Sequence, residues 1–452
     1  AICASCGTSY LVGKLDQDDE DGSETLRQAN PFETGLYYLL VDTASLNEDE
    51  ENEDEAAFVE DDEVEIDRDE RVLCTKCGDL AEGSERRCEC NSPHLVRVEV
   101  AHPTAPDAPL RKCVACSSRS PSGIVRRFVT YQDRPQTVIA SALYQSLPAS
   151  ALPELAHKVG EGRKLISFSD SRQDAAFFAS YMERSYSRSM QRHLIWAALQ
   201  GLPDDEIPRF EDLVPRVKNR AQESLVLDPD DGMKNTARVR HWLMREVLGV
   251  DRRESLDGIG LAEITVAIPR QVQAPPALQQ LGFSDDECMD LVRVLLDTVR
   301  IQAGVYVPED VDIADPLFAP RNVVNRLRSE GPNPSRHILS WQPGKGANGR
   351  LDYLKKVFGE RGIEVDPEQV LSDIWNHWLT APNNQWRAVL KDSTGREGTV
   401  FALNPESIEF RLHGPNHPAY RCNSCRKVWW RSVSQICPAF RCQGRLDVVE
   451  PD

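Results

Sequence analysis

Cysteine is the residue in this sequence whose spacing most clearly predicts chemistry. Twelve of the thirteen cysteines stand in close pairs, whereas Cys288 lies alone in a helical pattern that favours a buried thiol. A tight turn directs two thiolates to one ion, and two such turns complete the tetrahedral shell of zinc. At four ligands a site, the twelve paired cysteines predict about three zinc ions per chain. The pairs are Cys3/Cys6, Cys74/Cys77, Cys88/Cys90, Cys113/Cys116, Cys422/Cys425 and Cys437/Cys442.

The clearest set is a C-terminal zinc ribbon with the pattern Cys422-x2-Cys425-x11-Cys437-x4-Cys442. Four thiolates leave no coordination position open for water, so we expect structural rather than catalytic zinc. The segment 421–445 carries six basic residues and no acidic one, and Trp429 and Trp430 stand between the two ligand pairs. Such tryptophans can stack on nucleic-acid bases or pack the ribbon onto a neighbour. The sequence leaves both interpretations open.

The eight N-terminal cysteines suffice for two sites, but their spacing does not fix which pairs combine. We favour a nested arrangement, with one compact site from Cys74, Cys77, Cys88 and Cys90. The second site would tie the ends of the module together through Cys3, Cys6, Cys113 and Cys116. The sequential alternative combines Cys3/Cys6 with Cys74/Cys77, and Cys88/Cys90 with Cys113/Cys116. His94 and His102 lie nearby, but the thiols already supply enough ligands.

The negative charge of the chain is concentrated in one segment. Residues 48–70 hold fifteen acidic residues and one basic residue, which is −14 of the total of −19. The remaining −5 does not exclude a nucleic-acid partner. We expect this run to be a solvated loop, with a DNA-mimicking or autoinhibitory segment as the alternative. Since the sequence has no signal-peptide pattern and no run of eighteen apolar residues, we expect a cytoplasmic protein without a membrane partner.

Apolar periodicity predicts short strands near the N-terminus and mainly helices further on. A short apolar run at 163–168, followed by polar turn residues, predicts a buried strand that leads into a helix over 174–200. The other strands are expected at 37–41, 95–100, 124–131 and 261–268, and the other helices at 137–147, 209–225, 233–248, 284–303, 351–361 and 367–379.

The usual signatures of catalysis are missing from the sequence. There is no G-x4-G-K-[ST] phosphate loop, because the sequence PGKG at 343–346 is too short and no Ser or Thr follows it. Metal-binding motifs of the Asp-Glu-Ala-His type, arginine-finger motifs and nucleophile elbows are also absent. The sequence therefore assigns no catalytic residue to this chain.

Several stretches resemble one family of motor proteins. The segment KLISFSDSRQDAA at 164–176 resembles motif IV, at the start of the second RecA-like domain of superfamily 2 helicases. It is most similar to the large bacterial DEAD/DEAH-type helicases of the DUF1998, MrfA-like group, which includes helicases of the DISARM and Druantia anti-phage systems. Other matching stretches are CASCG at 3–7, RRFVTYQDRPQTVIASALYQSLP at 126–148, SWQPGKGANGRLDYL at 340–354 and the cysteine ribbon at 421–446.

The resemblance implies that the chain is the middle portion of an ATP-dependent DNA helicase or translocase acting in anti-phage defence or DNA repair. It begins Ala-Ile-Cys and ends Glu-Pro-Asp, and we expect it to be a segment of a longer protein or a processed chain. ATP and Mg²⁺ would then bind only through the rest of the parent. Its partners would be single-stranded or duplex DNA, the rest of the helicase and possible defence-system subunits. The alternative is a zinc-stabilised scaffold that binds proteins and has no motor role.

The implied fold is multidomain, of the α+β and α/β classes. Residues 1–131 would form a zinc module with two four-cysteine sites and the acidic loop. A linker helix and the strand–helix start of a RecA-like domain would occupy 132–201. A mainly helical insertion would follow at 202–400, and the zinc ribbon at 401–452.

Motif IV supplies the candidate nucleic-acid contacts. Ser169, Ser171 and Arg172 stand where a helix is expected to begin. A helix N-terminus has free N–H groups and a positive dipole end, so it favours a phosphate, and two hydroxyls and a guanidinium can hold that phosphate without reading sequence. In the alternative interpretation, Ser171 only caps the helix and Arg172 pairs with a neighbouring acid.

Overall fold

The structure is a computed structural model of the 452-residue chain. It describes residues 1–3, 8–17, 24–30, 33–40, 67–82, 90, 95–103, 108, 110–114, 123–127, 133–156, 158–166, 172–203, 206–228, 230–249, 255–269, 272–315, 318, 324–329, 337–343, 347–381, 385–395 and 398–449. The chain divides into two compact units. The barrel unit comprises Ala1–Val129, Cys422–Lys427 and Cys442–Arg445, and the helical unit comprises Thr130–Arg421, Val428–Arg441 and Leu446–Asp452.

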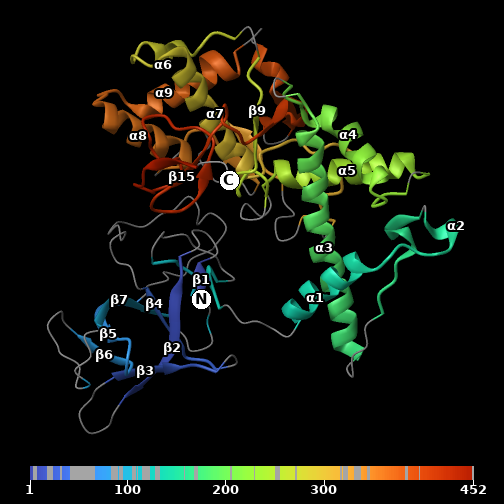
Figure 1. Cartoon of the computed structure of the whole chain (residues 1–452). Helices are drawn as coiled ribbons and strands as arrows, with labels where there is room; N and C mark the ends of the chain where they lie inside the picture. The colour runs from blue at the N-terminus through green and yellow to red at the C-terminus, as the bar shows by residue number, and fades with distance from the viewer. Residues whose placement is uncertain are drawn as a thin grey trace. The chain divides into compact units, whose positions relative to one another are not determined.

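The barrel unit is built on a closed antiparallel barrel with the strand order β2-β3-β6-β5-β7-β4 (blue in Figure 1). Its strands are β2 (Tyr10–Gln17), β3 (Glu24–Gln28), β4 (Tyr37–Leu40), β5 (Asp67–Cys74), β6 (Asp79–Glu82) and β7 (Leu95–His102). Strand β4 is buried on both faces: Leu39 packs with Leu73 and Val98, whereas Tyr38 and Leu40 join a second cluster with Cys3 and Cys113. A short strand pair, β1 (Ile2–Cys3) with β8 (Val125–Arg126), completes the described part of this unit.

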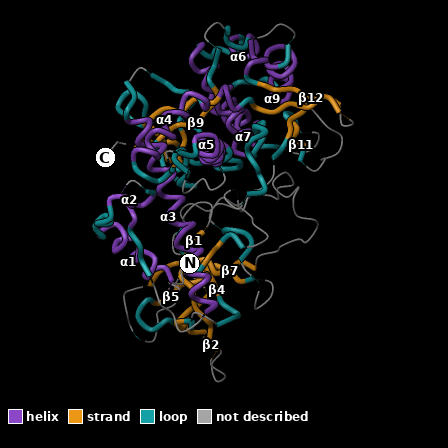
Figure 2. Tube along the Cα trace, turned by 90° about the vertical axis from the view of Figure 1, so that its right-hand side faces the viewer, coloured by secondary structure: helices purple, strands orange, loops and turns teal. Residues whose placement is uncertain are grey.

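Helices dominate the second unit, as the purple tubes in Figure 2 show. They are α1 (Asp133–Ser146), α2 (Pro153–Ala156), α3 (Arg172–Gln200), α4 (Phe210–Glu223), α5 (Gly232–Val247), α6 (Pro276–Gln279), α7 (Asp285–Ile301), α8 (Gly349–Arg361) and α9 (Pro367–Ile374), with a π turn at Trp375–Leu379 and short 3₁₀ turns at Val159–Gly162, Gln385–Ala388 and Pro405–Ser407. Among the described residues, none of these helices is both long enough and apolar enough to cross a bilayer.

Strands of the helical unit form three small sheets. One has the order β11-β10-β13-β12, one pairs β14 with β9, and the ribbon sheet has the order β16-β15-β17. Their bounds are β9 (Ala262–Val266), β10 (Arg326–Arg328), β11 (Ile338–Ser340), β12 (Leu390–Gly395), β13 (Gly398–Leu403), β14 (Ile408–Leu412), β15 (Ala419–Cys422), β16 (Val428–Trp429) and β17 (Leu446–Val449).

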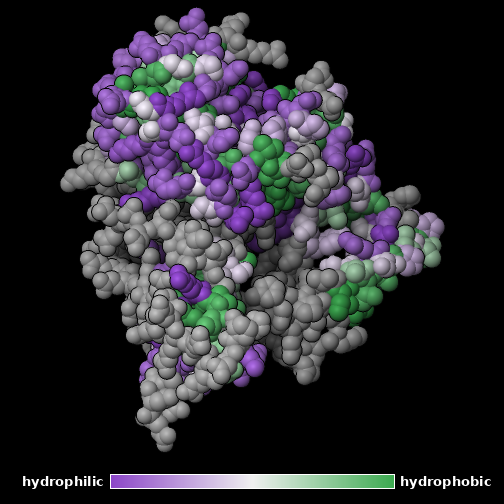
Figure 3. All heavy atoms as spheres, turned by 60° about the vertical axis from the view of Figure 1, so that its left-hand side comes forward, coloured by the Kyte–Doolittle hydropathy of each residue, from purple (hydrophilic) through white to green (hydrophobic). Residues whose placement is uncertain are grey.

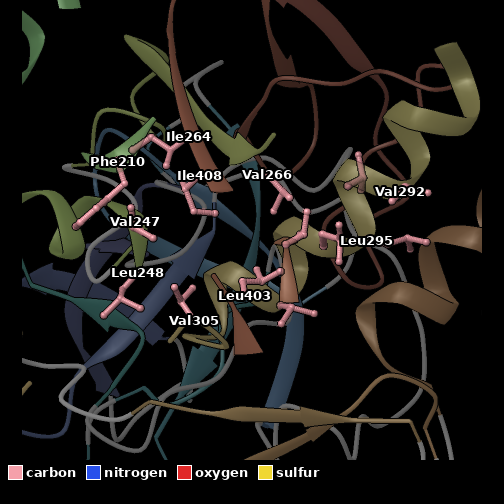
Figure 4. Close-up of a cluster of buried hydrophobic side chains, with 14 of the residues drawn as sticks. Phe210, Val247, Leu248, Ile264, Val266, Val292, Leu295, Val305, Leu403 and Ile408 are labelled. Carbon is pink, nitrogen blue, oxygen red and sulfur yellow. The ribbon is translucent and has the colours of Figure 1, made fainter. Parts of the chain in front are cut away.

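The core of the helical unit lies where α4, α5 and α7 pack around the β9–β14 pair. Figure 4 shows Phe210, Val247, Ile264, Leu295 and Ile408 in this cluster, and all five are fully buried. All five residues of β9 are buried, including the polar ones of its second face. On the face drawn in Figure 3, hydrophilic residues cover most of the described surface, with smaller hydrophobic patches between them.

All of the expected helices are present, but the expected strand at 163–168 is not seen in its described part. Residues 163–166 have no strand structure, and the side chain of Ile166 is 74% exposed; residues 167–171 lie outside the described residues. A strand needs neighbours for its backbone hydrogen bonds, and a short apolar run alone does not supply them. The RecA-like start remains an expectation, and only the helix that follows, α3, is described.

Two other segments differ from the expectation. The acidic run was expected to be a loop up to residue 70, but β5 begins at Asp67 and its backbone pairs with β7 from there onward. Residues 41–66 lie outside the described part of the chain. The expected strand at 124–131 is present only as Val125–Arg126, Arg127 is not in a strand, and residues 128–131 are not described. Pairing with neighbouring strands, not composition, sets these limits.

Some of the domain boundaries expected from the sequence fall at different residues in the structure. The expected boundary between residues 400 and 401 falls inside β13, and β14 pairs with β9 from the expected helical insertion. Residues 202–400, expected to be a helical insertion, hold α4 to α9 and also strands of the four-stranded sheet. At the other end, the barrel unit gives way to the helical unit after Val129, close to the expected boundary at 131.

Candidate metal centres

Four cysteines of the C-terminal ribbon gather their sulfurs in one place. The Sγ atoms of Cys422, Cys425, Cys437 and Cys442 lie within 4.8 Å of one another, and only Cys442 is partly exposed. The Sγ atoms of Cys422 and Cys442 are 3.6 Å apart. A disulfide would need about 2.05 Å, whereas thiolates around a tetrahedral zinc are separated by about 3.8 Å. The four side chains therefore fit a structural zinc ion.

The turn that carries Cys422 and Cys425 is held by its own backbone. The N–H of Cys422 donates to the Lys427 carbonyl at 3.0 Å, and the N–H of Arg426 donates to the Cys422 carbonyl at 3.1 Å. Strands β15 and β16 enter and leave this turn as an antiparallel pair. The hairpin thus directs both thiolates to one side, as zinc requires.

Gly444 lies against the sulfurs and leaves room for them. Its N–H donates to Cys442 Sγ at 3.4 Å, and a Cβ at this position would lie 2.4 Å from Cys422 Sγ. A side chain there would collide with a ligand atom. The glycine is therefore part of the ligand cradle, although the spacing of the cysteines did not indicate it.

The two tryptophans of the ribbon pack inside the protein. Trp429 is 8% and Trp430 is 6% exposed. The Trp430 indole donates to the Asp257 carbonyl at 3.3 Å, and its ring stacks on His417 with 5.4 Å between centroids. Of the two interpretations that the sequence left open, the structure supports packing. Neither ring is exposed enough to serve as a stacking surface for bases.

One of the six basic residues of the ribbon is also internal. Arg431 forms ion pairs with Glu263 at 2.9 Å and with Asp290 at 2.9 Å. His417 Nε2 lies 2.7 Å from the same Glu263 carboxylate, on the polar face of β9. Burial raises the pKa of Asp290, and the guanidinium of Arg431 opposes that shift. This arginine is therefore an internal ion-pair partner within the helical unit and is not part of a basic surface.

A second group of three sulfurs lies in the barrel unit. The Sγ atoms of Cys74, Cys77 and Cys90 lie within 4.8 Å of one another, and those of Cys74 and Cys90 are 3.6 Å apart. The hairpin between β5 and β6 positions the first two, with the Gly78 N–H donating to the Cys74 carbonyl at 2.9 Å. Gly78 has φ +84°, and a Cβ there would lie 2.4 Å from the Leu26 carbonyl oxygen, so the turn requires glycine.

These three cysteines belong to the compact site of the nested arrangement, whose fourth member, Cys88, lies outside the described residues. Cys3 and Cys113, from the other nested site, share one buried cluster, and the Tyr10 hydroxyl lies 3.1 Å from Cys113 Sγ. Their partners Cys6 and Cys116 are not described. Among the described residues, the geometry thus provides two groups that can hold zinc, and the third expected site stays a prediction.

The remaining candidate residues are not brought into a described site. His102 lies beside the Tyr37 ring and 3.1 Å from the Pro103 carbonyl, while His94 is outside the described part. Ser169 and Ser171 also lie outside it, and Arg172 opens α3 without a described side chain. The phosphate contact expected at motif IV is therefore untested by the geometry.

Chemically, the two cysteine groups are suited to cross-linking the fold. Zinc held by thiolates supplies structural bonds between separate turns of the chain, and a full thiolate shell keeps water from the ion. The ribbon ligands span residues 422–442, and the second group spans 74–90.

Comparison with known protein families gives a match to the first part of the chain. Residues 1–129 match the family model of the YjiV N-terminal domain. These are the residues that form the main segment of the barrel unit, Ala1–Val129. No curated protein and no solved structure matches the chain. The comparison thus shows that residues 1–129 are similar to the YjiV N-terminal domain.

Proposed function

We propose that this chain is the zinc-stabilised middle portion of a bacterial superfamily 2 DNA helicase or translocase, which serves in anti-phage defence or DNA repair. The observation that carries the proposal is the motif IV resemblance at 164–176, together with the start of α3 at Arg172. In this proposal the cysteine groups are structural, and ATP and Mg²⁺ bind to the rest of the parent protein.

The start of α3 offers a physical mechanism for binding the backbone of nucleic acid. The first four N–H groups of a helix have no partner within that helix, and its dipole places partial positive charge there. A DNA phosphate next to Arg172 would receive these N–H bonds together with a guanidinium. Such a contact positions the backbone of the nucleic acid and does not select its sequence.

A second candidate is a zinc-stabilised scaffold for partner proteins. Two apolar side chains on α1 favour it: Ile139 is 59% and Leu143 is 54% exposed, and their spacing of four residues places them on one helix face. In this alternative the parent has no motor activity, and α1 contributes to a protein interface.

Changing Arg172 to Ala in the full-length parent tests the motor proposal. We expect weaker binding to single-stranded DNA of every sequence, a salt slope about one unit smaller, and lower DNA-stimulated ATP turnover. The matched control is Arg220→Ala on α4, a half-exposed arginine that forms an ion pair with Glu223. The isolated chain, which lacks a phosphate loop, should turn over no ATP.

The outcomes separate the two candidates. If the Arg172 variant keeps its DNA affinity, salt slope and ATP turnover, Arg172 does not contact nucleic acid, and the motif IV resemblance no longer supports a function. A parent protein that neither binds DNA nor turns over ATP would leave the scaffold interpretation.

A further inference from the structure

Two charged side chains of helix α8, Asp352 and Lys356, contact the loop that carries Cys437 and Cys442. Asp352 and Lys356 are one turn apart, and the Lys356 ammonium lies 2.9 Å from Asp352 Oδ2. The N-cap of this helix fixes their direction, because the Asn348 side chain accepts from the Leu351 N–H at 3.0 Å. Both side chains are largely buried, with Lys356 9% exposed.

The ammonium of Lys356 forms two hydrogen bonds to the loop between Cys437 and Cys442. It donates to the Cys437 carbonyl at 2.9 Å and to the Ala439 carbonyl at 2.9 Å, in addition to the bond to Asp352. An ammonium has three donors, so each of them has an acceptor here. A buried lysine with this set of partners holds two backbone carbonyls of the loop at fixed positions.

Asp352 holds the other end of the same loop. Its Oδ2 accepts from the N–H of Arg441 at 3.1 Å. Arg441 has φ +54°, a left-handed conformation that a non-glycine residue adopts only at an energetic cost. Because Arg441 directly precedes Cys442, the carboxylate stabilises the backbone conformation that delivers this last ligand.

The two halves of the site are thus supported differently. The turn of Cys422 and Cys425 is closed by its own backbone bonds, whereas the longer loop from Cys437 to Cys442 is bonded to a helix about eighty residues earlier in the sequence, with separations of 81 and 83 residues. We propose that Asp352 and Lys356 are positioning residues of the C-terminal zinc site, which preset its second ligand pair. This inference rests on the proposal that the four cysteines bind zinc.

A consequence is that zinc occupancy and the packing of the helical unit depend on each other. Val433 and Ile436, which lie between the two ligand pairs, are part of the helical unit's hydrophobic core. Zinc would join the cysteines at both ends of this segment, and α8 forms hydrogen bonds to Cys437 and Ala439 just after it. Because the two are thermodynamically linked, a change that weakens the hydrogen bonds from α8 also weakens zinc binding. Loss of zinc in turn destabilises the core.

Zinc release to a chromogenic chelator tests the inference in the full chain. The release phase that disappears in Cys422→Ser is assigned to the ribbon site. Lys356→Met should accelerate that phase about 10- to 100-fold, since loss of an outer-shell partner typically lowers metal affinity by this factor. Lys355→Met is the matched control, because Lys355 is exposed on the same helix, and its release rate should equal that of the unchanged chain.

Two further variants distinguish a positioning role of Lys356 from a general loss of stability. Lys356→Arg should recover slow release at least in part, because a guanidinium can also donate to both carbonyls. If Lys356→Met does not fold, Asp352→Asn replaces it: the amide still accepts from Arg441 but loses the charge that faces Lys356, and release should accelerate by a smaller factor. Zinc of the Cys74 group should leave at an unchanged rate in every variant, which general destabilisation would not produce.

The inference is overturned if the ribbon phase of Lys356→Met matches that of Lys355→Met while Cys422→Ser lacks the phase. In that case zinc binds, but α8 does not position the site. If Cys422→Ser retains as much zinc as the unchanged chain, the zinc assignment of the ribbon fails, and this inference fails with it.

Discussion

At the scale of single residues, the candidate metal centres depend on glycines as much as on cysteines. Gly444 packs directly against Cys422 Sγ and donates its N–H to Cys442 Sγ. An N–H bond to a thiolate stabilises its charged form, which is the form that binds metal. The cysteine pattern identifies the ligands, but it does not reveal which neighbours must remain small.

Gly444→Ala should therefore impair zinc binding without removing a ligand. Its Cβ would lie 2.4 Å from Cys422 Sγ and 2.7 Å from Ser424 Cβ, so the cradle must shift. We expect zinc affinity of the ribbon to fall by about tenfold or more, measured by competition with a chelator.

Gly359→Ala on α8 is the matched control, because a Cβ there meets no atom within 4 Å. It should leave zinc affinity unchanged and stabilise the helix by up to about 1 kcal/mol. Equal affinity in the two variants would show that the cradle tolerates a methyl group.

At the scale of elements, buried charges join β9, α5 and α7. Arg300 of α7 donates to Asp257 at 2.8 Å, to Asp297 at 3.0 Å and to the Val247 carbonyl at 3.0 Å at the end of α5. Thr265 of β9 donates to Asp297 Oδ2 at 3.1 Å. The side chains of β9 and α7 and the last carbonyl of α5 thus meet in one polar cluster in the interior.

Asp297 makes the stability of this cluster depend on pH. Burial raises the pKa of its carboxyl to about 6, against the opposing effect of Arg300. Between the ordinary pKa, near 4, and 6, the folded chain retains a proton that the unfolded chain releases. The contribution of this group to stability therefore falls as pH rises through that window, by up to about 3 kcal/mol.

Asp297→Asn should remove that dependence. The free energy of unfolding of the unchanged chain, relative to this variant, should decrease from pH 4.5 to pH 7, as measured by denaturant unfolding. Asp447→Asn, at an exposed position of β17, serves as the control and should leave the pH profile as it is. A constant difference between the Asp297 variant and the unchanged chain across this range would contradict the raised pKa.

At the scale of the whole molecule, the ribbon is not a separate appendage. The Arg431 guanidinium forms an ion pair with Glu263, and Val433 lies in the core of the helical unit. Losing the zinc of the ribbon is therefore expected to affect more than the ribbon itself.

Zinc content and thermal stability test this expectation together. Cys422→Ser should lose about one zinc per chain and lower the unfolding temperature of the helical unit, because the segment that carries Val433 is no longer closed. Cys74→Ser should also lose about one zinc but leave the transition of the helical unit in place. Elemental analysis of the unchanged chain should find two to three zinc ions; a value of one or none would refute the metal assignment.

The sequence by itself determined the features that depend on local order. The four-cysteine group of the ribbon was predictable because a turn that can hold zinc needs two thiolates within a few residues. The helices α4, α5, α7 and α8 were predictable within a few residues because their apolar spacing is local.

Only the tertiary structure decided the rest, because it depends on pairing between distant segments. Closure of the barrel pairs β2 with β4 and β5 with β7, and nothing in a single strand specifies its partner. The burial of Trp430 depends on Asp257 and His417, and the support of Cys437 depends on Lys356. From the sequence alone, a polar strand residue such as Glu263 would be expected at the surface. In the fold it is buried, and an ion pair with the distant Arg431 offsets the cost of removing its charge from water.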